Sequence, residues 1–133
     1  MVEHSIQGCE LVLRYSGNSS PSEVRLSLLQ QDKYICNDEV TDLIADFNRC
    51  ESNAVFPQIL EEIASCVRIA TMTNPQLRVA VVTAKPETML QAEVSPVLGS
   101  FHYPIKLVDS SETARVWFKS TPLRSKHAAM LQA

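Results

Sequence analysis

The sequence predicts an α/β domain with a mixed, mostly parallel β-sheet that starts with an antiparallel hairpin and has helices packed on it. Three observations lead to this fold class. Arg78–Ala84 and Ile105–Asp109 are short runs rich in β-branched residues, as expected for strands buried on both faces of a sheet. Helical patterns lie between the later strands, which indicates parallel strands joined by crossovers. The first two apolar runs, in contrast, are joined by a tight turn.

The N-terminal hairpin is predicted from two strands, Val2–Ile6 and Glu10–Ser16, on either side of a turn at Gln7-Gly8-Cys9. Alternate residues of the second strand are large and apolar, which predicts that one of its faces is turned toward a core: Leu11, Leu13 and Tyr15.

The first helix is predicted to begin at Ser20-Pro21-Ser22-Glu23. Serine is a good capping residue, proline suits the first helical position, and the glutamate completes a capping box. The helix is expected to end near Gln31-Asp32, with three apolar residues on its buried side: Val24, Leu28 and Leu29.

The middle of the chain predicts a strand, a loop and a long helix. The strand covers Thr41–Phe47, the loop covers Asn48–Asn53, and the helix runs from about Val55 to Met72. Apolar residues recur at helical spacing along one side of this helix: Val55, Ile59, Ile63, Cys66, Val67 and Ala70.

After the strand at Arg78–Ala84, a further helix is expected to start at Lys85-Pro86-Glu87 and to kink or stop just before Pro96. The strand at Ile105–Asp109 then leads into a short helix over Ser110–Phe118, with Asp109 as a capping residue at its start.

Length and charge bound the organisation of the chain. With 133 residues, 45% hydrophobic and 20% charged, it predicts one globular domain over residues 1–118. Residues 119–133 carry three basic residues and no acidic one, which leaves −6 for the rest of a chain whose net charge is −3. We therefore expect a basic C-terminal tail, flexible or helical, and no nucleic-acid partner.

The four cysteines, Cys9, Cys36, Cys50 and Cys66, are too widely spaced for a C-x-x-C motif. The polar start of the chain does not resemble a signal peptide, and no apolar stretch approaches the length of a membrane span. The expected location is the cytoplasm, with reduced thiols that pack as small apolar groups.

Four segments in this order resemble the STAS domain class of anti-sigma-factor antagonists, and more closely the bacterial SpoIIAA-like family. They are Leu11–Gly17, Asp42–Phe47, Arg78–Val82 and Ile105–Asp109, the last followed by Glu112 to Trp117, in which the order Ala114-Arg115-Val116-Trp117 fits the family's E-A-x-x-W pattern. The resemblance covers about residues 2–118. It implies the SpoIIAA-like fold and a regulatory role carried out through protein contacts.

One departure from that family concerns the mechanism. Regulated antagonists carry Asp-Ser-Ser/Thr-Gly before the helix that follows the third strand, and a serine there is phosphorylated. This chain has Glu51-Ser52-Asn53 instead. Ser52 is therefore expected to be a loop residue or helix cap, and the phosphoserine switch is not carried over.

The candidate ligand-binding or partner-binding residues come from two regions. Asp46 ends a predicted strand, and the ends of parallel strands are where ligands collect; the residues expected nearby are Glu51, Ser52, Asn53 and Lys85. The alternative for Asp46 is a structural bond to backbone N–H groups of the following turn. Phe101 and Tyr103 belong to an apolar segment, Met89–Tyr103, that packs in the core, covers a cavity, dimerises or contacts lipid.

No metal site, cofactor or catalytic residue is predicted. The three histidines, His4, His102 and His127, lack the spacing of metal ligands, and the motifs of serine hydrolases and of phosphate-binding loops are missing. An enzyme that uses Asp46 with Ser52 is the least favoured hypothesis, because no base–nucleophile pair has a diagnostic spacing.

The leading hypothesis is a non-enzymatic interaction module that contacts an unknown protein, or a second copy of itself, along the helix from Val55 and the loop over residues 49–53. The alternative is a carrier of a small apolar ligand or lipid, held under the Met89–Tyr103 segment and associated peripherally with a membrane.

Overall fold

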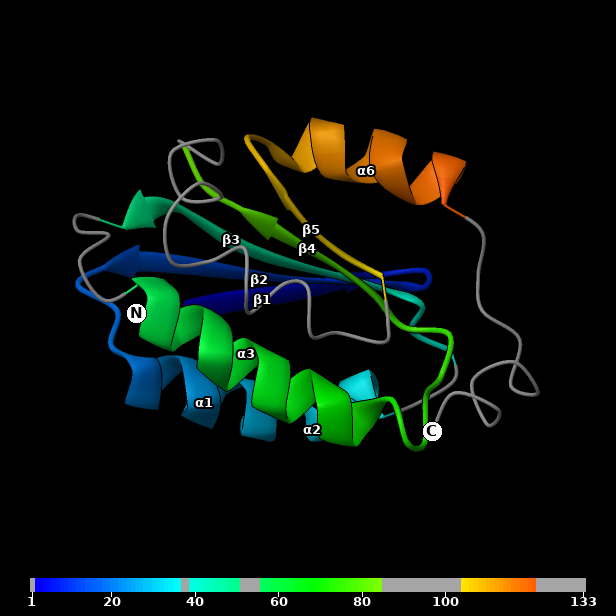
Figure 1. The fold of residues 1–133 in the computed structure, drawn as a ribbon, viewed down its shortest axis with the longest axis horizontal. Helices are drawn as coiled ribbons and strands as arrows, with labels where there is room; N and C mark the ends of the chain where they lie inside the picture. The colour runs from blue at the N-terminus through cyan, green and yellow to red at the C-terminus, as the bar shows by residue number, and fades with distance from the viewer. Residues whose placement is uncertain (1, 37–38, 51–55, 85–103, 122–133) are drawn as a thin grey trace.

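The structure is a computed structural model that describes residues 2–36, 39–50, 56–84 and 104–121 (Figure 1). The five strands are β1 (Val2–Gln7), β2 (Glu10–Gly17), β3 (Asp42–Cys50), β4 (Arg78–Val82) and β5 (Ile105–Val108). The helices are α1 (Pro21–Gln30), α2 (Asp32–Ile35), α3 (Phe56–Ala70) and α6 (Ser111–Ser120). The helix expected from Lys85 lies outside the described residues.

The strands form one sheet in the order β1-β2-β3-β4-β5. β1 pairs with β2 in antiparallel fashion, and the other neighbouring pairs are parallel, which confirms the predicted sheet. The hairpin turns at Gly8, which has a φ of 62°. A positive φ at the first position of a two-residue turn is characteristic of type II′, where glycine is the favoured residue.

Helices cover both faces of the sheet (Figure 1). We call α1, α2 and α3 the helical layer, and they lie on one face, whereas α6 lies on the other. The alternation along β2 divides its residues as predicted. Leu11, Leu13 and Tyr15 join the core under the helical layer, and Val12 joins the smaller core under α6.

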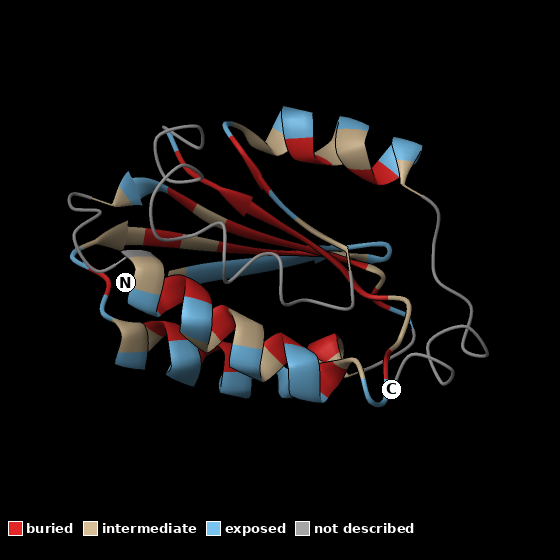
Figure 2. Ribbon diagram, viewed as in Figure 1, coloured by how far each residue is buried: buried red, intermediate tan, exposed pale blue. Residues whose placement is uncertain are grey.

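The two cores differ in size. The core under the helical layer contains the predicted stripe of α3, namely Ile59, Ile63, Val67 and Ala70. The core under α6 contains apolar residues of β2, β3, β4 and β5 together with Ala114 and Phe118 of the helix. Figure 2 shows that the central strands are buried, whereas β1 is exposed along nearly its whole length.

Both helix starts that capping predicts are present. The Ser20 hydroxyl accepts a bond from the backbone N–H of Glu23 at 3.1 Å, and Ser110 does the same for Thr113 at 3.1 Å. Asp109, which was expected to cap this helix, lies one residue before the N-cap. Its carboxylate accepts a bond from the Thr113 hydroxyl at 2.9 Å.

Besides the cap at Asp109, the structure differs from the expectations in three places. The strand predicted to end at Phe47 continues to Cys50. Arg49 and Cys50, which were expected in a loop, still pair with the end of β2 after a bulge. Leu29 is exposed, because its neighbour Leu28 takes the central position of the buried stripe. A short helix, α2, also follows α1. The Asn74 side-chain amide donates hydrogen bonds to the backbone carbonyls of Ile35 and Val40, at 2.9 and 2.7 Å. These bonds provide hydrogen-bond partners for the backbone at and after the end of α2.

Candidate functional site

Asp46 is the one predicted site residue that the structure describes. It is partly buried on β3, and its carboxylate accepts a bond from the backbone N–H of Asn48 at 2.9 Å, within the bulge. This is the backbone-bonding role that was weighed against a binding site. The other predicted residues lie outside the described ranges: Glu51, Ser52, Asn53, Lys85, Phe101 and Tyr103.

The polar residues around this end of the sheet bond to the fold itself. The Asn48 amide donates to the Asp109 carbonyl at 3.1 Å and so links the end of β3 to the end of β5. The Asp109 side chain is engaged by Thr113. What the structure describes here is therefore a network that holds the strand ends and the start of α6 together.

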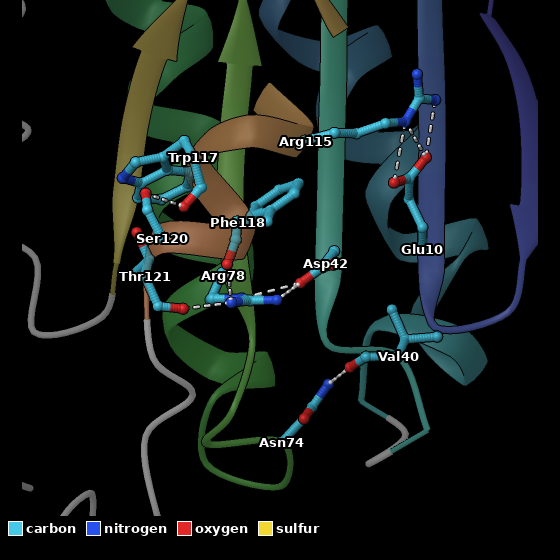
Figure 3. A network of polar contacts seen from close by, with 10 residues as sticks. All are labelled: Glu10, Val40, Asp42, Asn74, Arg78, Arg115, Trp117, Phe118, Ser120 and Thr121. Carbon is cyan, nitrogen blue, oxygen red and sulfur yellow. Dashed lines mark hydrogen bonds and ion pairs between the residues drawn. The ribbon is translucent and has the colours of Figure 1, made fainter. Parts of the chain in front are cut away.

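A second polar region fastens α6 to the sheet (Figure 3). Arg78 is buried on β4 and donates to one oxygen of Asp42 on β3 from Nε at 2.9 Å and from Nη2 at 2.5 Å. The same guanidinium donates to the carbonyls of Phe118 and Thr121, at the end of α6. It thereby satisfies carbonyl groups that a helix leaves unpaired at its C-terminus.

Arg115 forms the second attachment of α6. Its guanidinium reaches Glu10 on β2, with an Nη2–Oε1 distance of 2.9 Å (Figure 3). The hydrogen bond to Glu10 raises the pKa of Arg115, because the carboxylate favours the charged form of the guanidinium. Together with the contacts of Arg78, this ion pair gives the charged groups that hold α6 a structural role.

The helical layer carries a groove on its outer side. Helices α1 and α3 lie next to each other, with α2 close to their C-terminal ends (Figure 1). The groove between them has a volume of about 360 Å³. Its walls include apolar, charged and thiol side chains: Arg25, Leu29, Asp32, Glu62, Cys66 and Ile69. This size is in the range of binding sites in proteins.

The apolar walls of the groove are open to solvent. Leu29 is 54% exposed and Ile69 is 67% exposed, and each lines the groove from a different helix. Among the described residues, six large apolar side chains are exposed, and four of them belong to α1, to the C-terminal end of α3 or to the turn after α3: Leu26, Leu29, Ile69 and Met72. Single exposed apolar residues are common, but a concentration of them marks an interaction site.

The groove is lined by one basic and two acidic side chains: Arg25, Asp32 and Glu62. Arg25 belongs to α1 and Glu62 to α3, and neither takes part in an ion pair among the residues that the structure describes. Asp32 accepts a bond from the Cys36 thiol, with a distance of 2.9 Å between Sγ and Oδ1. Arg25 and Glu62 are therefore the two charged groups of the groove for which no described contact is found, whereas Asp32 accepts the bond from Cys36.

The thiol in the groove is poorly suited to nucleophilic chemistry. Burial raises the pKa of the Cys66 thiol, and the negative charge of Glu62 raises it further. The thiolate is the reactive form, and reactive cysteines lie in environments that lower the pKa. Cys66 is thus kept protonated near neutral pH, and the groove is better adapted to contact than to catalysis.

Part of this surface could have been found in the sequence. Ile69 lies outside the apolar stripe of α3, next in space to the polar side that carries Glu62 and Ser65, and an isoleucine at such a position is a signal for a contact surface. Leu29 was assigned to the wrong side of α1. No pattern within either helix, however, indicates that the two residues border the same groove.

Neither a metal-binding cluster nor a membrane-spanning helix occurs in the described part of the chain. Within the described residues, no group of three or more His, Cys, Asp or Glu side chains is placed to hold a metal ion. The helices in the same part of the chain are too short or too polar to cross a membrane.

Comparison with known proteins gives a likeness of structure only. No protein-family model matches the sequence, and no curated protein matches it. Among solved structures, the chain is similar to the anti-sigma factor antagonist SpoIIAA in its unphosphorylated form, with a TM-score of 0.52 and 12% sequence identity. The match covers 91% of this chain and 100% of that chain. This likeness confirms the predicted SpoIIAA-like α/β fold of the STAS class.

Proposed function

We propose that the chain is a non-enzymatic protein-interaction module with a SpoIIAA-like fold, which binds a protein partner in the groove between α1 and α3. The observation that carries the proposal is the exposure of Leu29 and Ile69 on opposite walls of one groove, beside Arg25 and Glu62. Apolar side chains at the centre with charged groups around them are the composition of a protein–protein interface.

The fold is consistent with such a role. The structurally similar SpoIIAA is an anti-sigma factor antagonist, a protein that acts on other proteins. The contact surface proposed for this chain follows from its own residues, since an identity of 12% transfers no binding residue. The sequence hypothesis placed the contacts along the same long helix. The contact surface proposed here involves only the part of α3 that lines the groove, from Glu62 to Ala70.

The module is proposed to work without a phosphoserine switch. Ser52 lacks the flanking Asp and Gly of regulated antagonists. The proposed contacts come from residues that line the groove, and Ser52 is not one of them.

Native mass spectrometry of the gently purified chain tests this function. We expect a bound protein in the wild-type spectrum and its loss in the double substitution L29E/I69E, which places two charges on the apolar walls. Val116 on α6 is 67% exposed, as is Ile69, so V116E is the matched control and should keep the complex. A bare wild-type chain would contradict the proposal, and a bound acyl chain in place of a protein would favour the carrier of an apolar ligand.

A further inference from the structure

We propose that the occupant of the α1–α3 groove is a second copy of this chain, related by a two-fold axis, so that Arg25 of each protomer lies against Glu62 of the other. This inference rests on the proposed function, because it names the partner of the same groove. It is argued from three observations: the placement of the charged side chains in the groove, the exposure of its apolar residues, and the exposed Met72 in the turn after α3.

Two of the three charged side chains of the groove make it complementary to itself. Arg25 projects from α1 and Glu62 from α3, and neither has an ionic partner among the described residues. A partner must therefore offer an acid opposite Arg25 and a base opposite Glu62. The same surface turned by a two-fold rotation offers both, because in such an interface each contact between two different residues occurs twice.

The apolar residues of the groove would be covered by the same contact. Leu29 follows Arg25 by one turn of α1 and Ile69 follows Glu62 by two turns of α3, and both are more than half exposed in the single chain. In a two-fold contact through the groove, the apolar walls of one copy meet those of the other, next to the charged pairs. Such a contact combines apolar burial with charge pairing, as stable interfaces do.

A groove also needs a protruding group to fill it. Met72 lies in the turn after α3, two residues beyond the end of the helix, and it is 84% exposed. Methionine is unbranched and adapts its shape to irregular spaces, which suits contact surfaces. In the proposed dimer, Met72 of each copy supplies this protruding group beside Leu29 and Ile69 of the other.

Sedimentation equilibrium with a charge-swap cycle tests the inference. The samples are the wild type, R25E, E62R and the double substitution R25E/E62R, each over a wide range of concentrations. We expect the wild type to dimerise and each single substitution, which sets like charges against each other, to weaken the dimer by about tenfold or more. The double substitution exchanges the signs on both walls and should restore the dimer, while V116E leaves it unchanged.

Two outcomes would overturn the inference: a wild type that stays monomeric at every concentration, or a double substitution as weak as the single ones. Arg25 is exposed and Glu62 is partly exposed, so the substitutions leave the core intact, and far-UV circular dichroism checks the fold. If R25E or E62R fails to fold, R25A and E62Q take their places and must each weaken the dimer. A monomeric wild type that binds a different protein through the groove refutes the dimer but keeps the proposed function, whereas a groove that binds no protein refutes both.

Discussion

The two faces of the sheet use their charged residues in opposite ways. On the α6 face, Arg78 and Arg115 turn toward carboxylates of the sheet, and these pairs hold the helix in place. On the helical layer, Arg25 and Glu62 lie on opposite walls of a groove and make no ion pair among the described residues. Charged side chains that are paired within the fold therefore indicate a structural face. Charged side chains that have no ion pair and lie beside exposed apolar residues indicate a contact face.

The apolar residues follow the same division. Val116 is the exposed apolar residue of α6, and it stands apart, while the helical layer carries Leu26, Leu29, Ile69 and Met72 within two helices and the turn after α3. The two faces can therefore be separated by experiment. Substitutions on the α6 face should change mainly stability, and substitutions at the groove should change mainly binding.

The largest effect on stability is expected for Arg78→Met. Arg78 and Asp42 have side chains only 10% and 12% exposed, so removing the arginine leaves a buried carboxylate without its partner. The expected loss is about 3–5 kcal/mol in the free energy of unfolding, measured by urea denaturation. Asp42→Asn in the same chain should recover part of it. A loss below about 1 kcal/mol would place this pair with ordinary surface ion pairs and contradict the structural role of the α6 face.

A second prediction concerns the stability of the protein at alkaline pH and rests on Tyr15, in the core under the helical layer. Burial raises the pKa of Tyr15 above its ordinary value of 10.0, and its hydroxyl lies 2.6 Å from that of Ser27. Above pH 10 the unfolded chain loses the phenolic proton while the folded chain keeps it, so stability falls as pH rises, by about 1.4 kcal/mol per pH unit for this group. Below pH 10 the stabilisation is fully present.

Tyr15→Phe isolates this contribution. At neutral pH the variant should lose about 1 kcal/mol with the hydroxyl bond. Between about pH 9 and about pH 11 its unfolding free energy should fall less steeply than that of the wild type, because the titrating group is gone. Parallel curves for the two proteins would show that Tyr15 does not remain protonated in the folded state.

A smaller effect is expected for Arg115→Gln, the second attachment of α6. The Arg115 side chain is 42% exposed, so solvent screens its pair with Glu10, and the expected loss is at most about 1 kcal/mol. A double-mutant cycle with Glu10→Gln, measured by urea denaturation at low and high salt, isolates the coupling. A coupling as large as that of the buried Arg78 pair would contradict the ranking of the two attachments.

The smallest effect on stability is expected at the groove. Ile69→Glu and Val116→Glu change residues that are both 67% exposed, so each should alter the free energy of unfolding by no more than about 0.5 kcal/mol. The two variants should therefore have similar thermal melting curves and differ only in binding. A large loss for Ile69→Glu alone would mean that Ile69 supports the fold and that the groove is not an open surface.

Much of the fold could be predicted because its signals are local. The β-branched run at Arg78–Ala84 indicated a buried strand, and the capping box at Ser20 located the start of α1. The extension of β3 to Cys50 was missed because it depends on pairing with β2 across a bulge, where Asp46 bonds to Asn48. The short helix α2 was missed for a similar reason, since Asn74 satisfies its last carbonyl from 39 residues away.

The candidate site was harder to predict than the fold. Its walls come from α1 and α3, and Leu29 and Ile69 border one groove only because the two helices pack side by side on the sheet. A sequence pattern reports which side of a helix is apolar but not which exposed residues of two helices become neighbours. The sequence-based hypothesis therefore named the helix from Val55 as a contact surface without distinguishing the part of it that lines the groove.

Site-specific photo-crosslinking tests the central claim most directly. A photoreactive amino acid replaces Ile69 in one variant and Val116 in another, two positions of equal exposure on opposite faces, and crosslinked products are identified by mass spectrometry. The account predicts a discrete protein-sized product from position 69 and none from position 116. Equal yields from both positions, or a product from position 116 alone, would contradict the assignment of the contact surface to the α1–α3 groove.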